Sequence, residues 1–263
     1  MNDTREQTTK RTPPIITTED MKKVMAMIDA RTDRREPSVP RANAAMAALV
    51  ALHTGLTAGE VCALDERDFT SYINARYGLL RVGATMRDAG PRHPRECATE
   101  AQYRDLFLHD ATIRRIREFE ARNYGRRGDP RPIIASYARP RKYPRAIPQI
   151  AWTRPAKVCG MFRTMCEGEG LGRPYTFGSL RRTHAAMLLR AGVPADVAAA
   201  CLGMADAARL ARDYGAECAE GEAHRSEWAA RVEDVRRDAW GSRDPEGRAA
   251  AAIIHDALAA LAG

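Results

Sequence analysis

The segment from Leu180 to Tyr214 constrains the fold of this 263-residue chain more than any other. It begins with Leu180-Arg181-Arg182-Thr183-His184 and continues as an apolar stretch with helical spacing. Ala191-Gly192-Val193 follows, and Gly192 is the residue type that ends a helix in the left-handed conformation. The segment closes with Leu202-Gly203-Met204 and Tyr214. It therefore predicts a helix that buries Leu180 and His184 and ends at Gly192.

The remaining apolar periodicity predicts further helices and a small sheet. A capping pattern of Thr17 and Asp20 opens the first helix, and Asp110 is the expected cap of a later one. The expected helices cover about 17–33, 41–53, 58–64, 110–122, 154–167, 220–240 and 246–261, and the expected strands cover 77–82 and 103–108, with an irregular basic stretch at 125–153. The predicted fold class is mainly α with a small antiparallel β-sheet, or α+β.

Three regions follow from this pattern. Residues 1–16 are polar, contain Pro13-Pro14 and predict a disordered lead-in. Residues 17–217 predict a single domain with its own core. Residues 218–263 predict a C-terminal helical extension that a Gly-Ser-Arg-Asp-Pro break at 241–245 divides into two helices.

A second block, Thr54-Gly55-Leu56-Thr57-Ala58-Gly59-Glu60, is followed by Leu64 and Asp68-Phe69. Together with the 180–214 segment, it resembles the catalytic domain of the tyrosine recombinases, or phage integrases. That family has Thr-Gly-Leu-Arg-x-x-Glu in the first block and His-x-Leu-Arg-His-Thr, Leu-Gly-His and a nucleophilic Tyr in the second. The resemblance covers roughly residues 17–217 and implies a mainly α fold with a small antiparallel sheet.

The resemblance assigns two catalytic positions that this chain keeps and three that it has replaced. Arg181 matches the second arginine, and Tyr214 matches the nucleophile, although it lies one residue later than is usual in the family. The first arginine and the two histidines are replaced by Thr57, Gly178 and Met204. The lysine of the family's β-hairpin has no counterpart, because no lysine occurs between Lys23 and Lys142.

These replacements remove groups that phosphodiester cleavage needs. A phenol with an ordinary pKa near ~10 must lose its proton, the phosphate oxygens need fixed donors, and the leaving oxygen needs an acid. Loss of one preorganised donor typically costs on the order of 10²–10³ in rate. The sequence therefore predicts a catalytically degenerate member of the family.

Charge points to an acidic partner, and double-stranded DNA is the partner that the resemblance implies. The chain has a net charge of +8, a pI near 9.4 and 37 arginines against five lysines. Arginine suits phosphate and guanine edges, although a codon bias toward arginine also explains the excess. The residues expected to contact DNA phosphates are Arg87, Arg92, Arg141, Lys142, Arg145, Arg181 and Arg182.

Each of these positions also has an ordinary structural explanation. Tyr214 is either a vestigial nucleophile or a half-buried packing residue. Arg181 either contacts phosphate or pairs with Glu60 or Asp68 inside the fold. His184 is expected in the core, and the basic stretch 126–145 is either a DNA contact or a solvated loop.

No feature of the sequence predicts a metal or a cofactor. The six cysteines (62, 97, 159, 166, 201 and 218) form no Cys-x-x-Cys pair. The polar N-terminus has no signal-peptide pattern, and the apolar run Ala44–Leu52 is too short to span a membrane. We therefore expect a reduced, cytoplasmic protein.

The first functional hypothesis is a duplex-DNA-binding accessory or regulatory subunit of a mobile element, or a repurposed DNA-binding protein. Sixteen polar residues before Thr17 cannot replace the family's N-terminal clamping domain, so a protein partner or self-association is expected. The C-terminal helix docks either in trans or on its own domain. The alternatives are an active recombinase that uses Tyr214, with Arg67 or Arg87 in place of the missing arginine, and a protein–protein adaptor.

Overall fold

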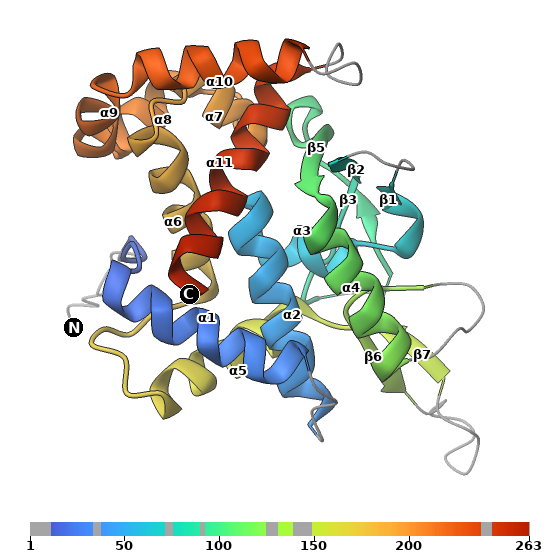
Figure 1. Ribbon diagram of the computed structural model, residues 1–263. Coiled ribbons are helices and arrows are strands. Elements are labelled where there is room, and N and C mark those ends of the chain that lie inside the picture. The colour runs from blue at the N-terminus through green and yellow to red at the C-terminus, as the bar shows by residue number, and fades with distance from the viewer. Residues whose placement is uncertain are drawn as a thin grey trace, which may run out of the picture.

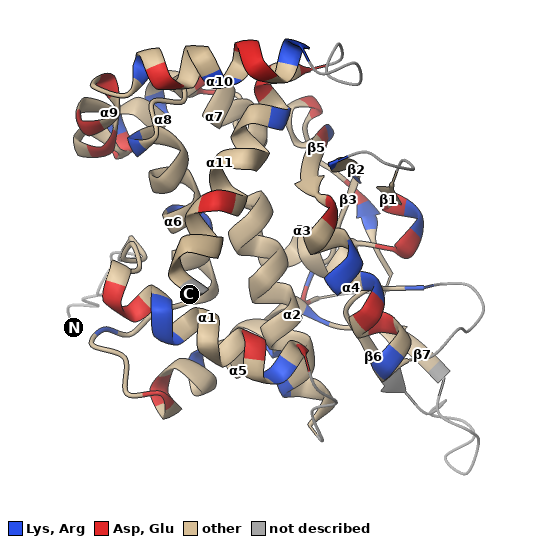
Figure 2. Ribbon diagram, viewed as in Figure 1, with Lys and Arg blue, Asp and Glu red and all other residues tan. Residues whose placement is uncertain are grey.

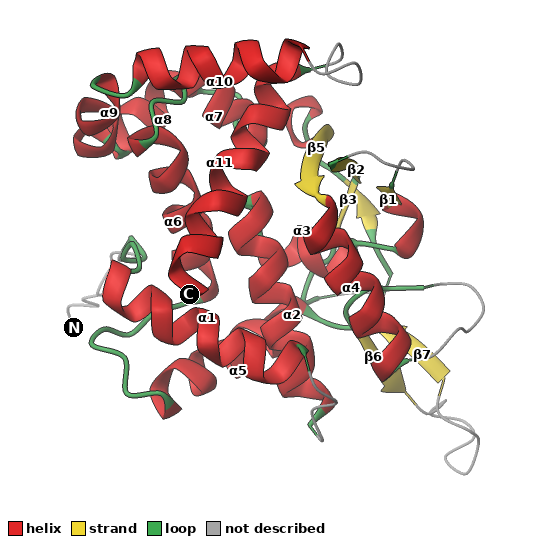
Figure 3. Ribbon diagram, viewed as in Figure 1, coloured by secondary structure: helices red, strands yellow, loops and turns green. Residues whose placement is uncertain are grey.

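The computed structural model describes residues 12–33, 38–71, 76–89, 93–124, 131–138, 149–237 and 244–262. Helices make up most of this part of the chain, and the strands gather on one side of it (Figures 1 and 3). The α-helices are α1 (Thr18–Thr32), α2 (Val39–Thr54), α3 (Ala58–Ala63), α4 (Asp110–Asn123), α5 (Pro155–Gly168), α6 (Phe177–Arg190), α7 (Ala195–Leu202), α8 (Ala207–Asp213), α9 (Gly215–Glu222), α10 (Arg225–Arg237) and α11 (Pro245–Ala262).

Helix α2 forms the centre of the core. Its residues from Ala42 to Leu52 are buried on every side, which is the pattern of a helix surrounded by other elements. Helices α1, α5, α6 and α11 pack against it. The ribbon of α2 is almost free of charge, whereas both signs of charge occupy the outer helices (Figure 2). Gly55, with φ +67°, ends α2 in the left-handed conformation.

The strands form one three-stranded sheet and two hairpins. They are β1 (Phe69–Thr70), β2 (Tyr77–Val82), β3 (Ala84–Thr85), β4 (Arg95–Glu96), β5 (Arg104–His109), β6 (Ala135–Ala138) and β7 (Gln149–Trp152), with short 3-10 helices at Glu66–Asp68 and Glu100–Gln102. The sheet has the order β1-β2-β5 and is antiparallel, with Tyr77 opposite His109 and Val82 opposite Arg104. The mainly α fold class with small antiparallel sheets is confirmed.

Three local expectations need correction. The helix expected over 220–240 is divided in two, because α9 ends at Glu222 and α10 begins at Arg225. The stretch 125–153 was expected to be irregular, but β6 and β7 pair as an antiparallel hairpin, with Ala135 opposite Trp152. The cap of α4 is His109, whose side chain accepts a hydrogen bond from the Ala111 N–H, and Asp110 is already the first helical residue. A histidine nitrogen satisfies an open N–H of the first turn as a carboxylate would.

The part of the chain that packs against the domain begins before residue 17, which is earlier than expected. Ile16 is 4% exposed, and its N–H donates to Thr183 Oγ1 at 2.9 Å, which ties the segment before α1 to α6. The predicted disordered lead-in of residues 1–16 is therefore shortened at its C-terminal end, while residues 1–11 lie outside the described part of the chain.

The C-terminal helices share the core of the domain. Helix α9 packs so closely on α6 that a Cβ at Gly221 would lie 1.8 Å from the Leu189 carbonyl oxygen. Helix α11 packs on its own domain, against α1, α6, α10 and β5 (Figure 1). Among the described residues, no helix combines the length and apolar character that a membrane span requires.

Candidate functional site

The ends of α2 and α7 meet the first turns of α6 and form the centre of the candidate site. A Cβ at Gly55 would lie 2.7 Å from both His184 Cδ2 and Leu202 Cδ2, so only glycine allows this approach. Gly203, with φ +66°, ends α7 in the same left-handed conformation. Both turns leave carbonyl groups without helical partners, and these carbonyls face α6.

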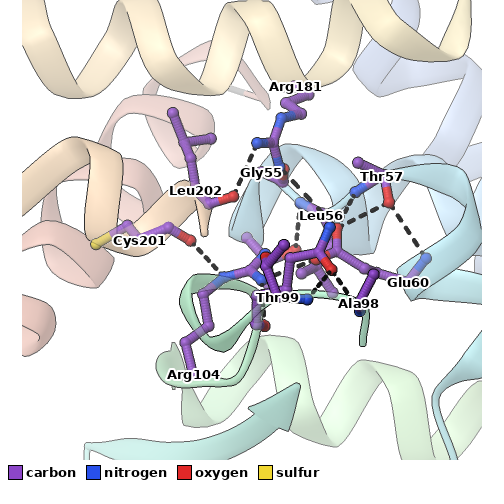
Figure 4. Close-up of polar contacts among 12 residues, drawn as sticks. Gly55, Leu56, Thr57, Glu60, Ala98, Thr99, Arg104, Arg181, Cys201 and Leu202 are labelled. Atoms are coloured by element: carbon purple, nitrogen blue, oxygen red, sulfur yellow. Dashed lines mark hydrogen bonds and ion pairs between the residues drawn. The ribbon is translucent and has the colours of Figure 1, made fainter. Parts of the chain in front are cut away.

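Arg181 connects the two turns. Its Nη1 donates to the Gly55 carbonyl and its Nη2 to the Leu202 carbonyl, each at 2.8 Å (Figure 4). Its Nη1 also lies 4.0 Å from Glu60 Oε2. The side chain is 23% exposed, so it takes part in the fold and still reaches the surface. Of the two carboxylates that the structural alternative offered to Arg181, Glu60 is the one in contact, and this contact is the longest of the three.

Thr57, where the family has its first arginine, is the N-cap of α3. Its hydroxyl accepts from the Glu60 N–H at 3.3 Å, and its N–H and hydroxyl both donate to Glu60 Oε2 at 2.8 Å. Ser and Thr are favoured at this position because the hydroxyl satisfies an open N–H of the first helical turn. Thr57 therefore contributes to the helix terminus and brings no positive charge to the surface.

Arg104, at the start of β5, is a positively charged residue of this cluster that no sequence pattern indicated. Its Nη1 lies 2.8 Å from Glu60 Oε1, and its Nε donates to the Cys201 carbonyl at 2.9 Å. Burial alone would raise the pKa of Glu60, but the charge and hydrogen bond of Arg104, together with Thr57, hold that pKa below its ordinary value. The available signal was an arginine at the second position of the strand expected at 103–108, and it does not indicate burial.

Tyr214 lies beside Arg182, immediately after α8. The Arg182 Cζ atom is 4.9 Å from the centroid of the Tyr214 ring, and Tyr214 is 8% exposed. Burial raises the pKa of the Tyr214 phenol, and the charges of Arg182 and Arg181 offset only part of that rise. The structure thus brings Tyr214, Arg181 and Arg182 together, with the phenol in its protonated form at neutral pH.

Gly178 and Met204 occupy the two positions that the resemblance aligns with the family's histidines. A Cβ at Gly178 would lie 3.0 Å from Pro13 Cγ, so the N-terminal segment occupies the space beside this glycine. Met204 is partly buried against the core, and its N–H donates to the Ala199 carbonyl at 2.9 Å in the cap of α7. Gly178 has no side chain and the Met204 thioether carries no donor hydrogen, so neither residue donates a side-chain hydrogen bond to a phosphate.

Arg87 lies on an exposed turn that is fixed on both sides. The Met86 N–H donates to the Gly59 carbonyl at 2.8 Å, and Asp88 Oδ1 accepts from the Ala156 N–H at 2.7 Å. These contacts hold residues 86–88 against α3 and the first turn of α5. Arg87 itself is exposed.

The other expected residues fall outside this cluster or outside the described chain. Arg92, Arg141, Lys142 and Arg145 lie outside the described residues. Arg67, which the alternative hypothesis put in place of the missing arginine, bonds Asp65 through its Nε at 2.8 Å. His184 is 4% exposed with its Nδ1 2.8 Å from the Leu52 carbonyl, so its expected place in the core is confirmed. Across the described residues, no three or more His, Cys, Asp or Glu side chains are arranged to hold a metal ion.

Comparison with known proteins gives matches in structure alone. No protein-family model and no curated protein sequence matches this chain. The XerH site-specific recombinase bound to a palindromic difH substrate, in a post-cleavage complex, superposes with a TM-score of 0.56 and 16% identity, over 85% of this chain and 54% of that one.

Two further structures agree with this match. The Tn1549 transposon integrase in complex with transposon right end DNA gives a TM-score of 0.59 and 16% identity, over 84% of this chain and 68% of that one. The XerA recombinase gives a TM-score of 0.51 and 15% identity, over 78% of this chain and 60% of that one. This chain therefore has the fold of site-specific recombinases and transposon integrases, as the resemblance implied, and it spans little more than half of the XerH and XerA chains.

Proposed function

We propose that this chain is a degenerate tyrosine recombinase that binds duplex DNA and cleaves it poorly or not at all. One observation carries the proposal: Arg181 and Arg182 lie partly exposed in the first turns of α6 with the buried Tyr214 ring beside Arg182, while Thr57, Gly178 and Met204 supply no phosphate donor beside them. Two guanidinium groups can hold a phosphate. The raised pKa of the Tyr214 phenol disfavours its attack on that phosphate.

An accessory or regulatory role in a mobile element, or a repurposed DNA-binding role, belongs to the same proposal. The DNA complexes among the matched structures support duplex DNA as the partner. A protein partner is also part of the proposal. Because α11 packs on its own domain here, self-association through α11 would first require this helix to undock.

Binding of a random-sequence duplex over a series of salt concentrations tests the proposal. For each phosphate neutralised, the slope of log affinity against log salt is about −0.9. We expect a wild-type slope of several units, reduced in magnitude by about one in Arg182→Ala and in Arg87→Ala. Arg237→Ala is the matched control, because Arg237 is an exposed arginine on α10 paired with Asp234. Wild-type protein that fails to bind at low salt contradicts the proposal and favours the adaptor.

A cleavage assay separates the degenerate protein from an active recombinase. Supercoiled plasmid is incubated with wild-type protein and with Tyr214→Phe, and the DNA is then examined for nicks and covalently attached protein. We expect no attachment in either sample. Attachment that disappears in Tyr214→Phe would instead establish an active nucleophile.

A further inference from the structure

The buried ion pair of Arg104 and Glu60 lies directly beneath Arg181. Both side chains of the pair are 7% exposed, and Glu60 Oε2 is 4.0 Å from Arg181 Nη1 (Figure 4). A buried carboxylate attracts a neighbouring positive group strongly, because little water screens the interaction. With Arg104 present, two guanidinium groups share one carboxylate, and one net positive charge remains for an external anion.

Arg104 also shapes the turn that holds Arg181. Its Nε donates to the Cys201 carbonyl, and Arg181 Nη2 donates to the next carbonyl, that of Leu202. A Cβ at Gly203 would lie 2.5 Å from Arg104 Nη1, so the guanidinium lies directly against this glycine. The two arginines therefore bind successive carbonyls of one turn, one from the buried side and one from the exposed side.

We propose that Arg104 is a positioning residue of the anion-binding site. It neutralises Glu60 and fixes the turn at Leu202, so that Arg181 presents its charge to a phosphate group of the DNA backbone. Without Arg104, Glu60 would pair with Arg181 and cancel that charge. The inference rests on the proposed function for the identity of the anion, and on the geometry of the three side chains for the role of Arg104.

The test is a charge-neutralisation cycle in the full chain. Arg104→Met leaves Glu60 unpaired, and Arg104→Met with Glu60→Gln removes both charges. We expect Arg104→Met to weaken duplex binding roughly ten- to a hundredfold and to reduce the magnitude of the salt slope by about 0.9, the loss of one phosphate contact. The double variant should recover most of the duplex affinity and most of the salt slope, because the neutral amide introduced by Glu60→Gln does not compete with phosphate for Arg181.

A matched control pair lies in the same sheet. Arg81 pairs with Asp105 at 3.3 Å, and both side chains are largely exposed. Arg81→Met and the double variant Arg81→Met, Asp105→Asn should both keep the wild-type slope. A purely structural role for Arg104 would make its double variant bind no better than Arg104→Met, and this result would overturn the proposal. An unchanged slope in Arg104→Met would also overturn it.

A second measurement does not depend on DNA. The side-chain Nε–H signal of Arg181, identified with Arg181→Lys, is followed by NMR during titration with inorganic phosphate. We expect the signal to shift in wild-type protein, to stay fixed in Arg104→Met and to shift again in the double variant. If wild-type protein binds phosphate in this pattern but binds no duplex, the proposed function fails while the role of Arg104 stands. Equal shifts in all three proteins contradict the role of Arg104.

Discussion

His184 shows at the scale of one residue how burial changes the chemistry of this site. It occupies the junction of α2, α6 and α7, where a Cβ at Gly55 would lie 2.7 Å from its Cδ2 atom. Burial lowers the pKa of His184 to about 4, although its hydrogen bond with the Leu52 carbonyl opposes the shift. The imidazole is therefore neutral at physiological pH and adds nothing to the positive charge of the site.

This shift predicts how stability depends on pH. Between pH 6.5 and about 4, His184 takes up a proton in the unfolded chain but not in the folded one. The free energy of unfolding should therefore fall as the pH decreases through this window, by up to about 1.4 kcal/mol per pH unit for this histidine. Urea unfolding at several pH values measures the slope.

Two variants separate His184 from the other titrating groups. In His184→Leu, the free energy of unfolding should fall less steeply as the pH decreases from 6.5 to about 4, whatever the effect of the substitution on stability at neutral pH. His93→Leu is the matched control, because His93 is exposed, and it should leave the decline unchanged. A decline of the same steepness in His184→Leu and wild-type protein would contradict the prediction.

At the scale of elements, helix α9 offers two glycines in opposite surroundings. A Cβ at Gly221 would lie 1.8 Å from the Leu189 carbonyl oxygen, whereas a Cβ at Gly215 would meet nothing within 4 Å. Gly221→Ala should force α9 away from α6 and lower the free energy of unfolding by several kcal/mol, more than the 1–3 kcal/mol that overpacking typically costs. Gly215→Ala should be neutral or stabilising by up to about 1 kcal/mol. Thermal or urea unfolding of the two variants measures these changes. Equal losses of unfolding free energy in both variants would contradict the prediction.

The elements show why some of this fold could be predicted from the sequence and some could not. Strand β2 alternates buried and exposed side chains along half its length, and Gly192 ends α6 with φ +83°, so local patterns were sufficient there. Strands β6 and β7 each have four residues and lie among prolines, so no period is visible. The contact of Arg104 with Glu60 depends on tertiary packing, which no local pattern encodes.

At the scale of the whole molecule, α11 joins regions that are distant in sequence. Its Ile254 and Leu258 are each 1% exposed, and its His255 stacks on His109 with ring centroids 3.7 Å apart. The helix thereby contacts the α-helical core and the end of the sheet at once. This part of the chain is a structural component of the domain.

The docking of α11 on its own domain can be tested through protein concentration. Leu258→Ala should lower the free energy of unfolding by about 2–5 kcal/mol, the usual cost of removing a buried leucine side chain. The loss should be the same at low and high protein concentration, because the contact is within one chain. Ala259→Ser, at the exposed neighbour, is the control. A loss that grows on dilution would indicate that α11 docks on a second copy instead.

The shared carboxylate of Glu60 also limits what a positive charge at position 57 could achieve. An arginine placed there by Thr57→Arg would remove the cap of α3 and bring a third guanidinium to a carboxylate that Arg104 already neutralises. The new side chain would thus enter surroundings that are built around Thr57 and Arg104. Accommodating an arginine at position 57 would require Arg104 to change as well, so a single substitution would not be sufficient.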